Sequence, residues 1–300
     1  MSVRKEWDDA KDQDGKRPES VTVHLTKNGK EVETVVLDGE NGWQHTWNGL
    51  EKYEEGIEIT YGVTEDGVEG YSTSISGNME SGYVVTNSYT PGETSVSVEK
   101  IWLDSENQDG KRPESIQVQL KADSVKRGET VTLDAAGGWK HTWENLPEKS
   151  GGKTISYTVE EVSVPEGYEV SYSGQGTSKI TITNSHEAEK TEISGTKKWE
   201  DDGNRDGKRP ESITVKLLKD GADTGISATA SAPGWNWSFT GLAKYEGGEL
   251  VNYGVEEGEV AGYTSTVEKK EDGTYTITNS HETEKTSVSV RKEWDDAKDQ

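Results

Sequence analysis

The chain contains no cysteine among its 300 residues and no long apolar run. The absence of cysteine excludes disulfide bonds and zinc–thiolate sites as sources of stability. Hydrophobic residues make up 29% of the sequence, which is little core material for one large globule but enough for thin domains of about one hundred residues each. No segment has the length and composition of a signal peptide or a transmembrane helix.

The formal net charge of −24 is spread over the whole chain. Such an acidic surplus disfavours binding to nucleic acids or anionic membranes, because both carry negative charge themselves. It also keeps an extended protein soluble. The five histidines do not cluster and no phosphate-binding loop is present, so we expect no metal centre, no nucleophilic triad and no cofactor.

The sequence repeats itself with a period of nearly one hundred residues. The string Asp-Gly-Lys-Arg-Pro-Glu-Ser begins at Asp14, Asp109 and Asp206, so the copies are 95 and 97 residues apart (109 − 14 and 206 − 109). With short alternating segments and few helix signals, this period predicts small all-β domains in tandem. We expect domains at 1–91, 92–188 and 189–285, and the first strand of a truncated fourth repeat at 286–300, because Ser289–Gln300 duplicates Ser2–Gln13. The short joints predict a semi-rigid, elongated rod with a frayed C-terminal segment.

In every repeat, three polar side chains fall on the apolar face of predicted strands. Side chains alternate along a strand, so the lysine of Val3-Arg-Lys5-Glu-Trp7 points where its valine and tryptophan point. The same test turns inward the glutamate that ends each Tyr-x-Val-x-Glu segment and the asparagine of each Thr-Asn-Ser segment. The nine residues are Lys5, Glu65 and Asn87, then Lys100, Glu161 and Asn184, then Lys197, Glu257 and Asn279.

Two outcomes are open for such buried groups. A lone buried charge costs several kcal/mol, so the three side chains can form a paired, hydrogen-bonded network. Alternatively, desolvation favours the neutral amine, which is a nucleophile. Its attack on the asparagine carboxamide, with the glutamate shuttling protons, would expel ammonia and leave a Lys–Asn isopeptide bond.

Four separated strings occur in versions in all three repeats. They are Lys5-Glu-Trp7-Asp8-Asp9, Asp14-Gly-Lys-Arg-Pro-Glu-Ser20, Gly42-Trp43 and Thr86-Asn87-Ser88. Together they resemble the B-type repeat of Cna-like surface proteins of Gram-positive bacteria. The resemblance implies tandem prealbumin-like or Ig-like β-sandwich domains, with crosslinks Lys5–Asn87, Lys100–Asn184 and Lys197–Asn279 assisted by Glu65, Glu161 and Glu257. Gly195 and Phe239 in the third repeat, and Glu65-Asp66-Gly67 in the first, depart from the pattern and predict less efficient bonding there.

The resemblance implies a structural function: a stalk or spacer in a secreted protein associated with the cell wall. Bond formation would be a single self-modification and not enzymatic turnover. The implied partners are neighbouring domains of the same chain and, through a domain outside this sequence, host extracellular matrix. An alternative is that the repeats themselves bind a host matrix protein or glycan, although loops such as 122–127 and 222–232 differ widely between repeats. A third alternative, a pilus shaft subunit, would need an intermolecular lysine motif and a sorting signal, and the sequence contains neither.

Three other features have competing interpretations. Asp202-x-Asn204-x-Asp206-Gly207 resembles the start of a calcium loop, but Ile213 stands where a bidentate glutamate is expected, which favours an Asx-stabilised turn. The ten tryptophans could stack on carbohydrate or pack in the core, and alternation favours the core. The pair Lys16-Arg17 and its copies lie in acidic surroundings and are predicted to be solvated.

Overall fold

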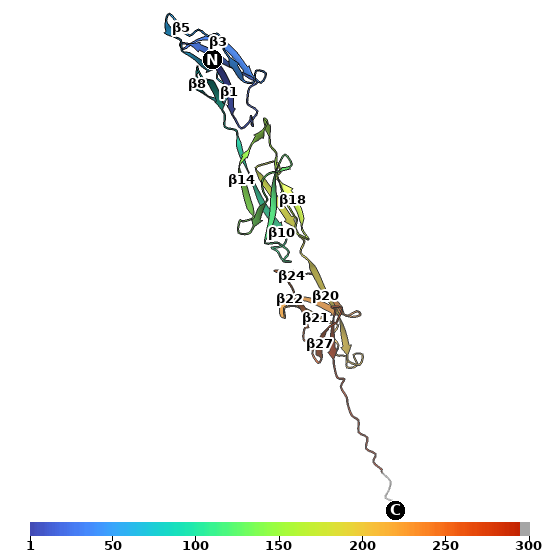
Figure 1. Cartoon of the computed structure of the whole chain (residues 1–300). Coiled ribbons are helices and arrows are strands. Elements are labelled where there is room, and N and C mark those ends of the chain that lie inside the picture. The colour runs from blue at the N-terminus through green and yellow to red at the C-terminus, as the bar shows by residue number, and fades with distance from the viewer. Residues whose placement is uncertain (295–300) are drawn as a thin grey trace, which may run out of the picture. The chain divides into compact units, whose positions relative to one another are not determined.

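The structure is a computed structural model that describes residues 1–294 and consists there of strands, turns and loops (Figure 1). Residues 1–294 contain no helix that is long and apolar enough to cross a membrane. The chain divides into two compact units. The first holds residues 1–101, 113–164 and 169–184, and the second holds residues 102–112, 165–168 and 185 onward.

Each repeat has nine or ten strands. The first repeat contains β1 (Ser2–Asp8), β2 (Ser20–Lys27), β3 (Lys30–Asp38), β4 (Gln44–Thr46), β5 (Tyr53–Glu54), β6 (Ile57–Glu58), β7 (Tyr61–Glu65), β8 (Ser72–Asn78) and β9 (Gly82–Ser88). The second contains β10 (Glu93–Leu103), β11 (Ser115–Ala122), β12 (Val125–Lys126), β13 (Val131–Asp134), β14 (Lys140–Pro147), β15 (Lys149–Ser150), β16 (Lys153–Thr154), β17 (Tyr157–Glu161), β18 (Glu169–Ser173) and β19 (Lys179–Ser185). The third contains β20 (Lys190–Glu200), β21 (Ser212–Lys219), β22 (Ala222–Ser231), β23 (Asn236–Ala243), β24 (Tyr245–Glu246), β25 (Glu249–Leu250), β26 (Tyr253–Glu257), β27 (Thr264–Lys269) and β28 (Tyr275–Ser280).

In the first repeat, two sheets form a sandwich. One sheet has the order β4-β1-β9-β8 and the other has the order β3-β2-β7, while β5 and β6 form a separate two-stranded hairpin. The first and last strands, β1 and β9, lie side by side and run parallel, with Lys5 opposite Val85 and Trp7 opposite Asn87. The second and third repeats have the same plan, with sheets β14-β10-β19-β18 and β23-β20-β28-β27 in the place of β4-β1-β9-β8.

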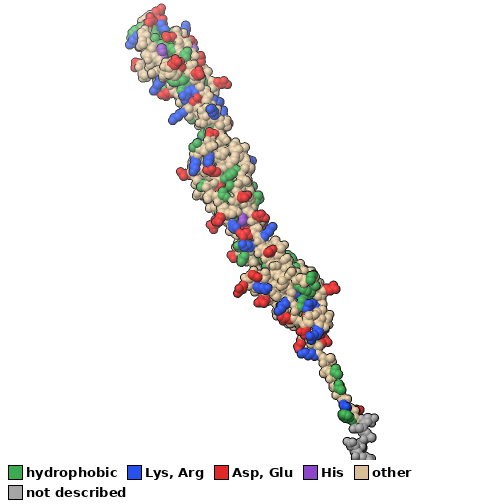
Figure 2. All heavy atoms as spheres, turned by 90° about the vertical axis from the view of Figure 1, so that its right-hand side faces the viewer, with side chains coloured by type: hydrophobic (Ala, Val, Ile, Leu, Met, Phe, Trp, Pro, Cys, Tyr) green, Lys and Arg blue, Asp and Glu red, His purple; other side chains and the backbone are tan. Residues whose placement is uncertain are grey.

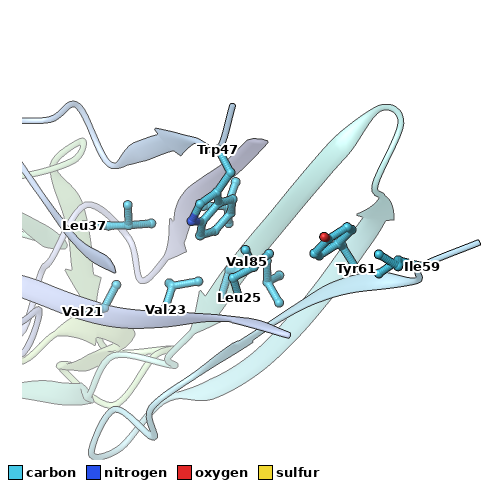
Figure 3. Packing of buried hydrophobic residues seen from close by; sticks show 10 residues of the cluster. Val21, Val23, Leu25, Leu37, Trp47, Ile59, Tyr61 and Val85 are labelled. Carbon is cyan, nitrogen blue, oxygen red and sulfur yellow. The ribbon is translucent and has the colours of Figure 1, made fainter. Parts of the chain in front are cut away.

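The core lies between the two sheets and follows from strand alternation. Val21, Val23 and Leu25 of β2 are buried, and Figure 3 shows them pointing toward Trp47 and Val85 of the opposite sheet. Each fully buried valine or leucine stabilises the fold by about 1.5–3 kcal/mol. The polar residues between them face outward, and Figure 2 shows acidic and basic side chains interspersed over one face of the molecule. The alternation in the sequence therefore gives a thin core under a strongly charged surface.

The third repeat fills its core differently from the first. Position 195 holds glycine where the first repeat has Val3, and its cross-strand partner is Trp237. A Cβ on Gly195 would lie 2.3 Å from Cζ2 of that indole, which is only 5% exposed. The tryptophan ring therefore occupies the space of the missing valine, and Phe239 is buried beside it. The third repeat therefore pairs a glycine with a large ring where the first repeat pairs Val3 with His45.

The segment after the third repeat carries no strand in its described part, residues 281–294. Val288, Val290 and Trp294 are 85%, 90% and 73% exposed. β1, with the same sequence, is paired on both sides by β4 and β9. The structure has no strand within 286–294, residues 295–300 lie outside the described part, and the first strand expected at 286–300 stays a prediction.

Candidate functional site

The three lysines lie in the middle of the first strand of each repeat and point into the sandwich. Lys5, Lys100 and Lys197 are 4%, 4% and 6% exposed. The backbone amide of Lys5 donates a 2.8 Å hydrogen bond to the carbonyl oxygen of Trp43, and the other two lysines make the same bond to Trp139 and Trp235. These hydrogen bonds fix the backbone of the first strand at the lysine against the loop that holds the tryptophan. The lysine side chain therefore enters the core from the same position in each repeat.

The glutamates come from the opposite sheet, where each is the last residue of a strand. The lysine Nζ lies 3.3 Å from a carboxylate oxygen of Glu65 in the first repeat, 3.4 Å from Glu161 in the second and 3.1 Å from Glu257 in the third. All six side chains are 0–1% exposed. Each repeat therefore has an ion pair that joins its two sheets through the core, shielded from water.

The asparagines lie on the last strand, beside the lysine strand, and Asn87, Asn184 and Asn279 are all 0% exposed. The carboxamide nitrogens of Asn184 and Asn279 donate to Glu161 and Glu257 at 3.0 and 3.2 Å. The structure thus brings together, in these two repeats, the lysine, glutamate and asparagine that strand alternation placed on one face.

The first repeat differs in one hydrogen bond. Here the hydroxyl of Thr73, on β8, donates to Oε2 of Glu65 at 3.2 Å. Among the described residues, the carboxamide of Asn87 has no hydrogen-bond partner. The position of Thr73 in the first repeat corresponds to Val170 in the second, so the second repeat has no hydroxyl group there. The glutamate of the first repeat is therefore turned toward threonine instead of asparagine.

Burial changes the protonation of the lysines. Desolvation lowers the pKa of Lys5 and of Lys197 below the ordinary value, and the nearby carboxylates of Glu65 and Glu257 only partly oppose this effect. A lowered pKa increases the fraction of neutral amine near pH 7, and neutral amine is the nucleophilic form.

The strand register places the amine within reach of the carboxamide. Lys5 faces Val85 and Trp7 faces Asn87, so the lysine and the asparagine lie on the same face of neighbouring strands, two residues apart. With the usual strand spacing, their Cα atoms are about 8 Å apart. A lysine side chain can span such a distance. The site thus brings together a primary amine, a carboxylate and a carboxamide, the three groups that an exchange of the amide nitrogen would need.

A second ion pair, between a buried carboxylate and a partly exposed arginine, was missed by sequence reasoning. Arg17 was predicted to be solvated, but it donates two hydrogen bonds to Asp9, at 2.6 and 3.0 Å, and Asp9 is 2% exposed. Arg112 with Asp104 and Arg209 with Asp201 form the same pair. The prediction was wrong for Arg17 because the loop folds back over eight residues, which local charge composition does not reveal, whereas Lys16 is exposed.

The tryptophans and the calcium-like loop have structural roles. Trp7 is half-buried at the end of the sandwich, edge-on to Trp43 and Tyr71, so it packs but is not fully enclosed. The backbone amide of Asn204 donates to Oδ1 of Asp201, and the side-chain Oδ1 of Asn204 accepts from the backbone amide of Arg209, as in an Asx-stabilised turn. No group of three or more metal-ligating side chains occurs in residues 1–294.

Two packed sheets, of which one holds its first and last strands in parallel, with a lysine, glutamate and asparagine buried between them define a class of tandem β-sandwich modules. The Cna protein B-type domain family matches the chain three times, at residues 1–88, 96–185 and 193–280, and the chain belongs to this family.

Two relatives extend the comparison. The chain is 43% identical over 300 residues to a collagen adhesin of Staphylococcus aureus and covers 24% of that protein's length. It also resembles the crystal structure of two B repeat units of the collagen-binding protein of Staphylococcus aureus, with 39% identity and a TM-score of 0.57. That match covers 94% of this chain and 74% of the other. The similarity extends over the whole chain but over only a quarter of the adhesin.

Proposed function

We propose that this chain is a stalk or spacer segment of a Gram-positive surface protein, in which each repeat is closed by a Lys–Asn isopeptide bond. One observation carries the proposal: the same buried lysine–glutamate pair, with an asparagine at 0% exposure beside it, recurs in all three repeats. The domains would be 1–91, 92–188 and 189–285, and the crosslinks would be Lys5–Asn87, Lys100–Asn184 and Lys197–Asn279. The parent protein would be secreted and associated with the cell wall.

The chemistry is a single transamidation within the core. The neutral lysine Nζ attacks Cγ of the asparagine, and the glutamate takes a proton from the attacking nitrogen and delivers it to the departing amide nitrogen. The new C–N bond forms as the old one breaks, and one ammonia leaves for each bond. The product amide does not titrate, so the reaction replaces a buried amine whose charged form is costly by a neutral group.

The position of the bond gives it a mechanical role. Asn87 follows Lys5 by 82 residues (87 − 5), so the bond would tie the first strand to the last. Without it, unravelling would release on the order of 270 Å of chain. By analogy with a disulfide that closes such a loop, the bond would stabilise the repeat by about 4.5 kcal/mol. Its larger effect would be on resistance to proteolysis and to pulling, because the chain between the two residues could not be extended.

The intact mass of the purified chain under denaturing conditions tests the proposal. Three bonds reduce the mass by three ammonia molecules. Lys5→Arg, Lys100→Arg and Lys197→Arg should each restore one of them. Lys198→Arg is the matched control, because Lys198 neighbours Lys197 but is 61% exposed and points outward. An unshifted mass would leave the three residues as a buried polar network.

A second candidate function is binding by the repeats themselves. It is suggested by the relative named as a collagen adhesin, of which this chain spans 24%. If the mass is unshifted, or if the repeats bind collagen or a glycan array directly, this function becomes the better description.

A further inference from the structure

The hairpin β15–β16 of the second repeat rests on a loop of the first. At its tip, the amide of Gly152 donates to the carbonyl oxygen of Gln13 at 3.1 Å. A Cβ on Gly15 would lie 2.6 Å from Cα of Gly152, so the two backbones touch where side chains cannot fit. At the base of the hairpin, the amide of Glu148 donates to the carbonyl oxygen of Gly92 at 3.0 Å.

The third repeat makes the same contacts with the second. The amide of Gly248 donates to Gln108 at 3.0 Å, a Cβ on Gly110 would lie 2.5 Å from Cα of Gly248, and the amide of Lys244 donates to Glu189 at 3.0 Å. Here the side chains pair as well, with Nζ of Lys244 2.8 Å from Oε2 of Glu189. The joint is therefore a repeated structure with fixed partners, made from a glycine hairpin and an Asp-Gly loop.

The Asp-Gly loop of the third repeat has the same geometry as the loop of the second repeat that forms the joint. Oδ2 of Asp206 accepts the amide of Glu284 at 2.8 Å, as Oδ2 of Asp109 accepts that of Glu189 at 2.7 Å. Gly207 has the same left-handed φ as Gly110, 66° against 68°. Within the described residues, a Cβ on Gly207 would meet nothing within 4 Å. The loop therefore has the backbone conformation of the loop in the second repeat, but no hairpin covers it within the described residues.

The hairpin β5–β6 of the first repeat corresponds to the hairpins β15–β16 and β24–β25 that form the two joints. Gly56, with φ 83°, matches Gly248, with φ 85°, and Lys52 stands where the third repeat has Lys244. Glu55 replaces Gly247, and a Cβ on Gly247 would meet nothing within 4 Å, so a side chain is tolerated there.

We propose that the hairpin 52–58 of a first-type repeat docks on residues 206–208 and Glu284 of a third-type repeat that precedes it. The partner is a further three-repeat segment with this sequence, joined through the segment 289–300. Because Ser289–Gln300 is identical to Ser2–Gln13, a chain that continues from Gln300 with residue 14 re-creates the first repeat in register. Lys52 would pair with Glu284 as Lys244 pairs with Glu189. The inference rests on the proposed stalk function but not on the isopeptide bond.

Disulfide trapping in an extended chain tests this joint. Residues 1–300 are followed directly by residues 14–300 of the same sequence, which gives six repeats. Glu284→Cys in the first half is combined with Lys52→Cys in the second half. These residues would be joined by a backbone hydrogen bond, as Lys244 and Glu189 are, which brings Cα atoms to a separation that a disulfide can bridge. No native cysteine competes.

Two comparisons decide the outcome. Glu189→Cys with Lys244→Cys calibrates the rate for an existing joint, and Glu284→Cys with Lys30→Cys of the second half, on a different turn, gives the rate of random encounter. We expect the test pair to close at least about tenfold faster than the random pair, because docking raises the effective concentration of the two thiols. Gly56→Val in the second half should abolish that advantage, whereas Gly29→Val, at φ 80° and in open space, should not. Equal rates for test and random pairs overturn the proposal, while the ammonia deficit in the same samples reports the isopeptide bonds independently.

Discussion

Replacing Glu161 by alanine should leave the second repeat folded but without its crosslink. The carboxylate lies 3.4 Å from Nζ of Lys100 and 3.0 Å from Nδ2 of Asn184, so it is the group placed to transfer the proton between them. Without it, the amine has no base and the departing nitrogen has no acid. The intact mass under denaturing conditions should then be two ammonia molecules below the mass calculated from the sequence, instead of three.

The stability of the second repeat should fall for two separable reasons. An ammonium left unpaired in a fully buried site costs about 3–5 kcal/mol. The lost closure of the 84-residue loop (184 − 100) costs about another 4.5 kcal/mol. Together these approach the whole stability of a domain of this size, about 5–15 kcal/mol. The thermal transition of the second repeat should therefore separate from those of the first and third and move to lower temperature, which scanning calorimetry resolves.

The neighbouring Glu160 provides the control for this substitution. Its side chain points outward, is 41% exposed and pairs with Lys121. Glu160→Ala should keep all three ammonia deficits and shift the transition by only a few degrees, since exposed ion pairs contribute about 0–1 kcal/mol. A full deficit of three ammonia molecules in Glu161→Ala would remove the glutamate from the mechanism, whatever happens to stability.

Three further predictions concern positions at which the repeats differ. Thr73→Val frees the glutamate of the first repeat to bond its asparagine, so the ammonia deficit of that repeat should develop faster in freshly refolded protein followed by mass spectrometry; an unchanged or slower rate would contradict this. Gly195→Val places a side chain against Trp237 and should destabilise the third repeat by about 1–3 kcal/mol in urea unfolding, with rescue by Trp237→His, the residue type at position 45; absence of rescue would show that the overlap is not the cause. His186 donates from both ring nitrogens, to Asp109 and to the carbonyl oxygen of Gly167, and the Asp109 carboxylate is the main cause that raises its pKa. The stabilisation that protonated His186 gives to this loop is therefore complete below about pH 6.5, and it is lost as the pH rises through the raised pKa of His186. Hydrogen exchange of the Glu189 amide, which also binds Asp109, should accelerate there beyond the intrinsic rate, and His186→Tyr should remove the dependence.

Strand alternation predicted which face the nine polar residues occupy, and the structure buries all nine side chains. This succeeded because the period of a strand is two residues and does not depend on its partners. The all-β class was predicted for the same local reason, and the three-fold repetition was predicted from the string Asp-Gly-Lys-Arg-Pro-Glu-Ser that recurs at Asp14, Asp109 and Asp206. That the residues form isopeptide bonds stays a proposal.

Features that depend on distant contacts could not be predicted in this way. The sequence does not reveal that Thr73 reaches Glu65, because the two residues lie on strands of different sheets. Nor does it reveal that Trp237 fills the space above Gly195, or that Arg17 folds back onto Asp9. In each case a side chain is placed by a contact with a different strand or loop, and a local pattern contains no information about which strand or loop that is.

The parallel pairing of β1 and β9 determines how a repeat would respond before any bond forms. Tension on the chain pulls β1 from its N-terminal end and β9 from its C-terminal end, so the two strands slide past each other along their length. In this shear geometry, the hydrogen bonds of the ladder are loaded together, whereas antiparallel terminal strands would be peeled apart one bond at a time. A newly folded repeat would thus already resist extension through this ladder alone, with the lysine and the asparagine held in register on neighbouring strands.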